Sequence, residues 1–177
     1  MKVVELGLPG VKLIEPKVFG DSRGFFLETW NAARYAAAGI PGPFVQDNLS
    51  RSARNTVRGL HFQDPNPQGK LVSCLAGAVW DVVAEIRPDS PFFGRWLGVE
   101  LSAETRRQLW VPPGYAHGFA VLSEFADFAY KVDAPYSPAD EKIVRWNDPG
   151  LAIDWKIDPA AAILSARDAG AAGLRDH

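Results

Sequence analysis

The chain has 177 residues, of which 47% are hydrophobic, and its formal net charge at pH 7 is −2. A chain of this length and composition can bury a core, so we expect one folded domain over residues 1–177. The near-neutral charge argues against a protein that coats a nucleic-acid polymer. Neither a secretory signal nor an apolar run of membrane-spanning length is present, which predicts a cytoplasmic protein without membrane contact.

The first third of the chain predicts short extended segments and one helix. Residues 1–19 are interrupted by prolines and a glycine, and residues 21–30 form a turn that leads into an aromatic strand. The predicted helix covers residues 31–39 and starts at Asn31, a good N-cap residue. Residues 44–50 then predict a strand with a polar exit.

The rest of the chain predicts many short strands. A hairpin runs from Arg58 to Lys70, and residues 78–87 form a longer strand whose alternation puts Asp81 and Glu85 on one face. Further predicted elements are strands at 94–101, 108–111, 117–122, 127–132 and 142–146, and a helix at 160–172. Turns rich in Pro and Gly separate many of the strands, and βαβ alternation is absent, so we expect an antiparallel barrel or sandwich. The lack of a glycine-rich phosphate motif argues against Rossmann and P-loop sites.

His61, Lys70 and Tyr130 are the candidate catalytic residues that the strand pattern itself suggests. The hairpin brings the His61 imidazole and the Lys70 ammonium near each other on a half-buried sheet. A neutral histidine is a usable base near neutral pH and can remove a proton from a carbon next to a carbonyl group. A cation in a dry barrel then stabilises the oxygen of the resulting enolate. Tyr130, on a later strand, is a weak acid. It can deliver a proton to the opposite face of the deprotonated carbon, which inverts that centre. In isolation, His61 is equally explained as a histidine without a task, and Tyr130 as a packed aromatic.

Metal binding and thiol chemistry are weaker interpretations. Cupin-type barrels commonly bind a metal through a His-x-His pair, a Glu and a later His, whereas here His61 is followed by Gln63 and then by Lys70. With His117 as the late histidine, two imidazoles and an amide beside an ammonium make a poor metal site, so we predict none. Cys74 is the single cysteine, lies in an apolar run, and is predicted to be a buried structural thiol.

Sequence blocks spread along the chain carry a closer resemblance. They are residues 21–28, 46–52, 58–63, 68–70, 90–94, 107–119, 130–131, 136–138 with Glu141, 146–149 and 164–169. In these blocks, and in their order, the chain resembles the dTDP-4-dehydrorhamnose 3,5-epimerase family. The resemblance implies an all-β, antiparallel jelly-roll barrel of the cupin type with a few short peripheral helices. It also implies a homodimer that acts without metal or cofactor on a dTDP-4-keto-6-deoxy sugar, in dTDP-L-rhamnose biosynthesis.

The resemblance also implies roles for individual residues. His61 is the base, Asp168 pairs with its far ring nitrogen, Lys70 stabilises the enolate oxygen at C4, and Tyr130 returns a proton. Arginines suit the diphosphate because a guanidinium presents a fork of donors to phosphate oxygens. The positions that match substrate-binding residues are Arg23, Glu28, Gln46, Asn48, Arg58, His117, Glu141 and Arg167.

Two placements depend on local geometry. Arg58 lies on the strand face opposite to His61, so it reaches the same cavity only if Gly59 forms a bulge. Ser165 and Asp168 have the spacing of a helix capping box, which is an alternative to pairing with His61. The spacing alone does not place Asp168 beside the histidine.

Three alternative functions remain open at this stage. One is an epimerase that acts at C3 only or at C5 only, on a related dTDP-4-keto-6-deoxy sugar. A second is a barrel that binds a sugar nucleotide without catalysis, and a third is a metal-dependent cupin oxygenase or isomerase. The joint presence of His61, Lys70, Tyr130 and Asp168 favours the enzyme over the binding barrel.

Overall fold

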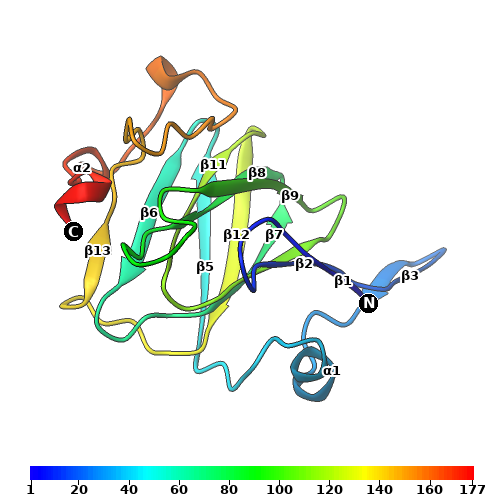
Figure 1. The fold of residues 1–177 in the computed structure, drawn as a ribbon. Coiled ribbons are helices and arrows are strands. Elements are labelled where there is room, and N and C mark those ends of the chain that lie inside the picture. Colours follow the sequence, from blue (N-terminus) through cyan, green and yellow to red (C-terminus); the bar gives the residue numbers. More distant parts are fainter.

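A computed structural model describes residues 1–177 and shows two antiparallel sheets packed face to face as a barrel (Figure 1). The strands are β1 (Lys2–Glu5), β2 (Lys12–Glu15), β3 (Val18–Asp21), β4 (Gly24–Leu27), β5 (Gln46–Ala53), β6 (Val57–Gln63), β7 (Lys70–Ala76), β8 (Ala78–Glu85), β9 (Trp96–Ser102), β10 (Gln108–Val111), β11 (Tyr115–Val121), β12 (Phe125–Val132) and β13 (Glu141–Ile143). The helical segments are α1 (Ala32–Ala37), η1 (Pro159–Ala161), α2 (Ala166–Ala169) and η2 (Leu174–Asp176). None of the helices has the length and apolar character that crossing a membrane would require.

One sheet has the strand order β1-β2-β10-β7-β12-β5, and the facing sheet has the order β13-β6-β11-β8-β9. Neighbouring strands in both sheets are antiparallel. This arrangement confirms the predicted all-β antiparallel barrel with short peripheral helices.

The main hydrophobic core lies between the two sheets. Val72 and Phe128 come from the β7–β12 side, whereas Val83 and Phe119 come from the β8–β11 side, and all four belong to one buried cluster. The core therefore fills one part of the barrel interior and leaves the region near β5 and β6 to polar side chains.

The alternation predicted for residues 78–87 is confirmed. Asp81, Val83 and Glu85 are fully buried on one face of β8, while Val82 and Ala84 join a second cluster on the other face. This second cluster also contains aromatic and aliphatic side chains of the C-terminal segment, which cover the outer face of the sheet. Polar groups at the inward positions of β8 are thus held away from water.

The two predicted helices have different outcomes. Helix α1 is confirmed, with Asn31 as an N-cap whose side chain accepts a hydrogen bond from the Arg34 amide at 3.1 Å. The helix predicted at 160–172 is present only as the single turns η1 and α2. Between them Ile163 is extended, and its backbone exchanges hydrogen bonds with the chain near β6. Tertiary pairing therefore overrides the helix propensity of this alanine-rich segment.

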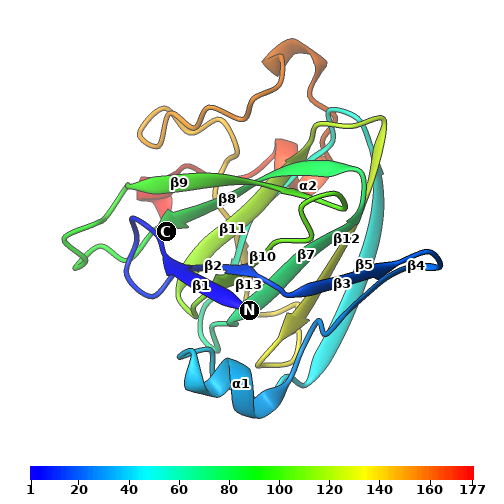
Figure 2. The same cartoon turned by 90° about the vertical axis from the view of Figure 1, so that its right-hand side faces the viewer.

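The β3–β4 hairpin forms its own two-stranded sheet and projects from the barrel (Figure 2). Its aromatic side chains are unusually exposed, with Phe25 at 58% and Phe26 at 71% of full accessibility. Exposed phenylalanines on a projecting hairpin are typical of a surface that contacts another protein.

Candidate active site

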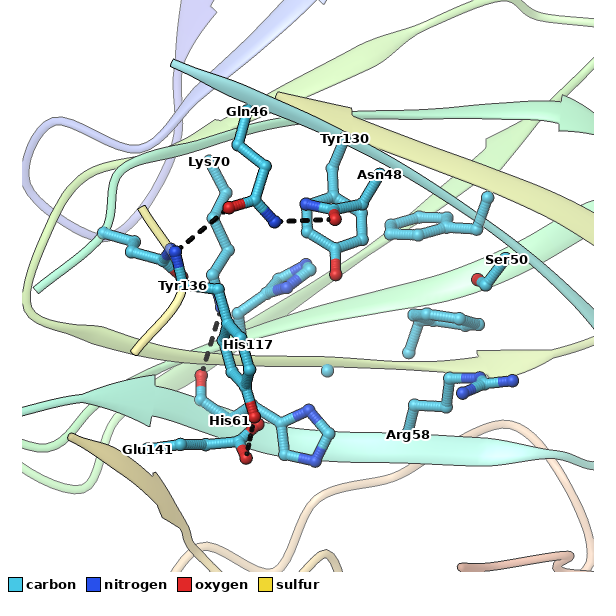
Figure 3. A pocket seen from close by; sticks show the side chains of 14 residues that line it. Gln46, Asn48, Ser50, Arg58, His61, Lys70, His117, Tyr130, Tyr136 and Glu141 are labelled. Atoms are coloured by element: carbon cyan, nitrogen blue, oxygen red, sulfur yellow. Dashed lines mark hydrogen bonds between the residues drawn. The ribbon is translucent and has the colours of Figure 1, made fainter. Parts of the chain in front are cut away.

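A cavity of about 340 Å³ opens between the two sheets (Figure 3). Its lining is mostly polar and consists of Gln46, Asn48, Ser50, Arg58, His61, Gln68, Lys70, His117, Gly118, Phe119, Phe128, Tyr130, Tyr136 and Glu141. Most of the residues predicted from the sequence are therefore brought together in one place, although they come from six different strands. A concave site with several convergent polar groups is the usual form of a small-molecule binding site.

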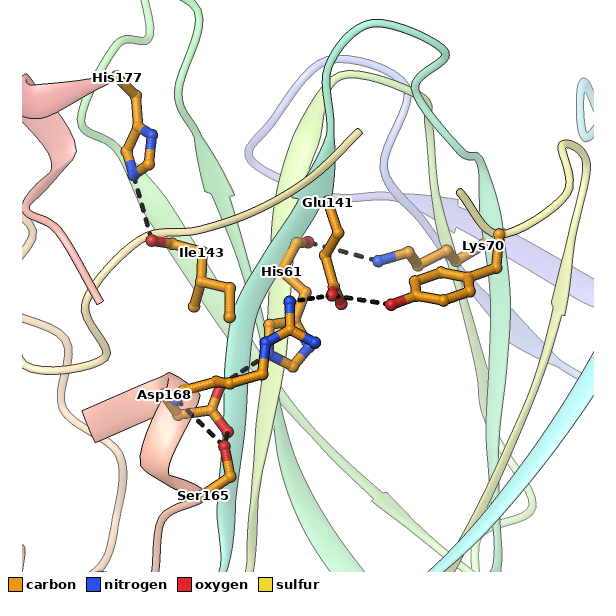
Figure 4. A network of polar contacts seen from close by, with 9 residues as sticks. His61, Lys70, Glu141, Ile143, Ser165, Asp168 and His177 are labelled. Carbon is orange, nitrogen blue, oxygen red and sulfur yellow. Dashed lines mark hydrogen bonds and ion pairs between the residues drawn. The ribbon is translucent and has the colours of Figure 1, made fainter. Parts of the chain in front are cut away.

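His61 and Asp168 form a hydrogen-bonded pair at the edge of this cavity (Figure 4). The distance from His61 Nε2 to Asp168 Oδ1 is 2.6 Å, and Asp168 is only 4% exposed. Ser165 is the N-cap of α2, and its hydroxyl donates to Asp168 Oδ2 at 2.7 Å. Ser165 therefore caps α2, but the reciprocal bond of a capping box is not formed, because the Asp168 carboxylate accepts from the Ser165 hydroxyl and contacts His61 instead. With Nε2–H engaged, Nδ1 is left as the free acceptor of the ring.

The electrostatics of the pair favour an ionised Asp168. Burial alone would raise the pKa of this carboxyl, but hydrogen bonds from His61 and Ser165 outweigh burial and hold the pKa below its usual value. An ionised Asp168 fixes the tautomer of His61 and stabilises the imidazolium that forms when the ring accepts a proton.

Lys70 starts β7 and is buried. The prediction that one hairpin pairs the His61 and Lys70 strands is wrong, because β6 and β7 lie in facing sheets and the two residues meet across the barrel interior. The Lys70 Nζ donates a long hydrogen bond of 3.4 Å to the backbone oxygen of His61. Burial lowers the pKa of the Lys70 ammonium to about 8, while the carboxylates of Asp81 and Glu141 act in the opposite direction. The cavity thus holds a poorly solvated positive charge, which is the environment in which a cation stabilises an oxyanion most strongly.

Tyr130 reaches the cavity from the opposite sheet. It lies on β12, whereas His61 lies on β6, and its hydroxyl points into the space between the sheets (Figure 3). Burial raises the pKa of this hydroxyl; Arg58 opposes the shift and Glu141 adds to it. Tyr130 therefore stays protonated near neutral pH and is available as a proton donor.

Arg58 lines the same cavity because β6 is bulged, as predicted. Between its pairings with β11, β6 contains one extra residue, and Arg58 and His61 therefore share a face. Gly59 has φ of +126°, and a Cβ there would lie 2.7 Å from the Cα of Gly118. Only glycine fits this close approach of two strands. The Arg58 side chain is held by a hydrogen bond of 3.0 Å from its Nε to Ser52 Oγ.

A second His–Asp pair lies deeper in the barrel. His117 Nε2 is 2.9 Å from Asp81 Oδ1 and 3.0 Å from Oδ2, and both side chains are buried. The alternation of β8 predicted that Asp81 shares a face with Glu85, but it assigned Asp81 no role. An aspartate in an otherwise apolar strand was visible in the sequence. Identifying His117 as its partner, however, required the register between β8 and β11.

Three polar residues that line the cavity, Ser50, Gln68 and Tyr136, were also missed. Ser50 is two positions beyond Asn48 on β5, so the period-two alternation of that strand was sufficient to find it. Gln68 and Tyr136 lie in loops, where no periodicity indicates direction, although both fall inside the blocks that carry the resemblance.

Polar contacts tie the mouth of the cavity together. Gln46 accepts a hydrogen bond from the Tyr136 amide at 3.1 Å and donates one to Asn48 at 2.9 Å. The Tyr136 hydroxyl donates to Glu141 at 2.9 Å (Figure 3), and Arg167 forms an ion pair with the same carboxylate. Arg167 thus contacts the site through Glu141, while the next residue, Asp168, hydrogen-bonds His61.

Arg23 and Glu28 lie outside the cavity of their own chain. Arg23 sits at the turn of the β3–β4 hairpin and forms an ion pair with Asp21 at 2.6 Å. Glu28 follows the hairpin and pairs with Arg34 of α1. Arg23 is exposed and Glu28 is partly buried, and neither side chain lines the cavity.

The distribution of metal-binding and thiol side chains is also informative. No group of three or more His, Cys, Asp and Glu side chains is arranged to hold a metal ion. Cys74 is free and buried, as predicted, and burial raises the pKa of its thiol to about 11. A thiol that stays protonated is a poor nucleophile.

Comparisons with known proteins identify the family. A family model described as dTDP-4-dehydrorhamnose 3,5-epimerase matches residues 5–176. The dTDP-4-dehydrorhamnose 3,5-epimerase of Pseudomonas aeruginosa is 52% identical over 169 residues, which cover 95% of this chain and 93% of that protein. The enzyme of the same name from Salmonella typhimurium is 51% identical over 173 residues, covering 97% of this chain and 94% of that protein.

A solved structure shows the same similarity. The dTDP-6-deoxy-D-glucose-3,5-epimerase of Legionella pneumophila, crystallised with dTDP-4-keto-L-rhamnose, is 50% identical and superposes with a TM-score of 0.95. The match covers 98% of this chain and 93% of that one. The chain therefore belongs to the dTDP-4-dehydrorhamnose 3,5-epimerase family of isomerases and has its cupin-like, jelly-roll fold.

Proposed function

We propose that this protein inverts C3 and C5 of dTDP-4-dehydro-6-deoxy-D-glucose, giving dTDP-4-dehydro-L-rhamnose, in dTDP-L-rhamnose biosynthesis. The observation that carries the proposal is the convergence of His61, Lys70 and Tyr130 on one cavity, with Asp168 behind the histidine. A barrel that only bound a sugar nucleotide would have no need of this combination.

The first step in this proposal is proton removal by His61. Taking a proton from carbon with a histidine base is uphill by about ten pK units or more, and each unit costs about 1.4 kcal/mol. An adjacent carbonyl lowers this cost because the resulting negative charge resides on its oxygen. In the proposed complex the Nδ1 of His61 accepts the proton, and Asp168 stabilises the imidazolium.

The enolate that forms needs a positive partner at its oxygen. Lys70 supplies this as a buried ammonium whose charge is poorly screened. C3 and C5 both flank the C4 carbonyl, so the same ammonium stabilises the enolate formed on either side. One base and one cation can therefore serve two successive epimerisations.

Inversion then requires a proton from the other face of the sugar. Tyr130 and His61 approach the cavity from facing sheets, which is the arrangement that such a reaction needs (Figure 3). At the far end of the cavity Arg58 offers its guanidinium to the diphosphate, while Gln46 and Asn48 offer amide groups to the rest of the nucleotide sugar.

The proposal is tested by running the reaction in D₂O with a chelator present and no added metal. We expect the product to carry deuterium at both C3 and C5, because each carbon is deprotonated and then reprotonated from solvent-exchanged groups. NMR and mass spectrometry of the product measure this directly. Deuterium at one carbon only would restrict the protein to a single-site epimerase. Loss of activity with the chelator, restored by a divalent ion, would contradict the metal-free mechanism.

We also propose that the active protein is a homodimer. The β3–β4 hairpin projects from the barrel with exposed phenylalanines, and it carries Arg23 and leads to Glu28, both outside the cavity of their own chain. A symmetric dimer would cover this apolar surface and bring the two charged residues to the partner's cavity.

The dimer has a direct test. Sedimentation at micromolar concentration is expected to give twice the mass of one chain. A double change of Phe25 and Phe26 to serine is expected to weaken association and to raise KM, because the hairpin would no longer reach the partner's cavity. A fully active monomer would contradict this proposal.

A further inference from the structure

Asp81 is a buried carboxylate to which the proposed reaction assigns no step. It lies on β8 in the interior of the barrel and is 0% exposed. Both of its oxygens are within hydrogen-bonding distance of His117 Nε2, at 2.9 and 3.0 Å. With His117 Nε2 protonated, both oxygens accept from the same N–H, which is the arrangement of an ionised carboxylate.

The charged and titratable groups around Lys70 come from every element packed against it. They are Asp81 on β8, His117 on β11, His61 and Arg58 on β6, Tyr130 on β12, Glu141 on β13, and Tyr136 in the preceding loop. Only two of these groups are carboxylates. Glu141 already accepts hydrogen bonds from Tyr136 and Arg167 at the mouth of the cavity, so its charge is shared. Asp81 is completely shielded from water, and its charge acts on Lys70 with little screening.

We propose that Asp81 is a positioning residue that keeps the Lys70 ammonium charged and holds the His117 ring beside it, and that it thereby sets the alkaline limit of the reaction. This inference rests on the proposed function, because it assigns to Lys70 the stabilisation of the enolate oxygen. Asp81 itself touches neither the substrate nor the reacting atoms in this account.

The direction of the pH effect follows from burial. Burial lowers the pKa of Lys70 to about 8 even though Asp81 acts against this shift. The charged form is the useful one, so activity is lost as the pH rises through this value. Without the Asp81 charge, the ammonium would lose its proton at a lower pH. Burial raises the pKa of Asp81 in turn, and the His117 N–H and the Lys70 ammonium oppose that shift.

Glu85 provides a matched control on the same strand. It has the same parity as Asp81 and is also 0% exposed. Its carboxylate, however, accepts hydrogen bonds from Arg87 Nε at 2.8 Å and from Ser90 Oγ at 3.0 Å, and it is not one of the carboxylates that act on Lys70. Neutralising Glu85 removes a buried charge from β8 without changing the charge that faces Lys70.

The experiment compares kcat and KM of the wild type, Asp81→Asn and Glu85→Gln from about pH 6 to about pH 10. We expect the alkaline limb of kcat in Asp81→Asn to move down by about one pH unit or more, which lowers kcat relative to the wild type by about fivefold at pH 8 and about tenfold well above that pH. Glu85→Gln is expected to unfold at a lower temperature and to keep the wild-type limb. An unmoved limb in folded Asp81→Asn, or an equal loss at every pH, would overturn the inference.

A second measurement covers the case in which Asp81→Asn does not fold. Coupling between two titrating groups is reciprocal, so removal of the Lys70 charge raises the pKa of Asp81 by the same amount that Asp81 raises the pKa of Lys70. In Lys70→Met, carbon-13 NMR of the Asp81 carboxyl is therefore expected to show an upward shift of its titration. An unchanged titration would overturn the inference. This measurement needs no turnover, so an inactive wild type would refute the proposed function while leaving the coupling testable.

Discussion

His61→Ala is expected to abolish deuterium exchange and epimerisation together, with a loss of at least about 10²–10⁴-fold in each. The only other imidazole in the cavity, that of His117, is also paired with a carboxylate, but its side chain is 7% exposed in the depth of the barrel, whereas that of His61 is 32% exposed at the cavity edge. Without proton removal no enolate forms, so every later step stops as well. The measurement is proton NMR of the substrate in D₂O, which reports exchange and inversion in the same sample.

The control for this variant is His177→Ala. His177 is exposed and hydrogen-bonds the backbone oxygen of Ile143, away from the cavity (Figure 4). It is expected to exchange and epimerise the substrate at the wild-type rate. If His61→Ala retained exchange at C3 or C5, another residue would have to be the base.

Tyr130→Phe is expected to separate exchange from inversion. The enolate still forms in this variant, and His61 can return a proton to the face that it left. Because His61 is partly exposed, its proton exchanges with solvent, so deuterium still enters the substrate. Inversion is expected to fall by about 10²–10⁴-fold, as for the loss of a positioned acid, while exchange falls much less.

Tyr136→Phe is the matched control, since it removes a hydroxyl from another tyrosine of the same cavity. The Tyr136 hydroxyl is hydrogen-bonded to Glu141 at the mouth, so we expect KM to rise and the ratio of exchange to inversion to stay at the wild-type value. Equal losses of exchange and inversion in Tyr130→Phe, with substrate binding intact, would contradict the assigned division of labour.

The barrel was predictable because strand alternation reports burial directly. The parity of residues 78–87 placed Asp81 and Glu85 on one face before any pairing was known, and the structure confirms this shared face and shows that it points into the barrel. The helix at 160–172 was wrong because alanine content reports only local propensity. The extended conformation of Ile163 comes from pairing with a strand about a hundred residues earlier in the chain, which no local window contains.

The site was predictable in a different way. His61 and Lys70 were expected to meet on one hairpin, but β6 and β7 lie in facing sheets, so the two side chains meet across the barrel interior. The bulge at Gly59 was required by the parity of Arg58. Asp168, by contrast, is 107 residues from its partner His61, so only the family resemblance placed the two together. Such long-range pairs depend on how the sheets and the C-terminal segment pack, which sequence periodicity does not encode.

The most direct test of the whole account is the ratio of deuterium wash-in to inversion, measured in one D₂O time course for the wild type, His61→Ala and Tyr130→Phe. A mechanism in which the base and the acid lie on opposite faces of the enolate predicts a ratio of wash-in to inversion near unity for the wild type. It also predicts neither signal for His61→Ala and a ratio raised by at least about tenfold for Tyr130→Phe. The same ratio in the wild type and Tyr130→Phe, or wash-in without His61, would contradict the mechanism.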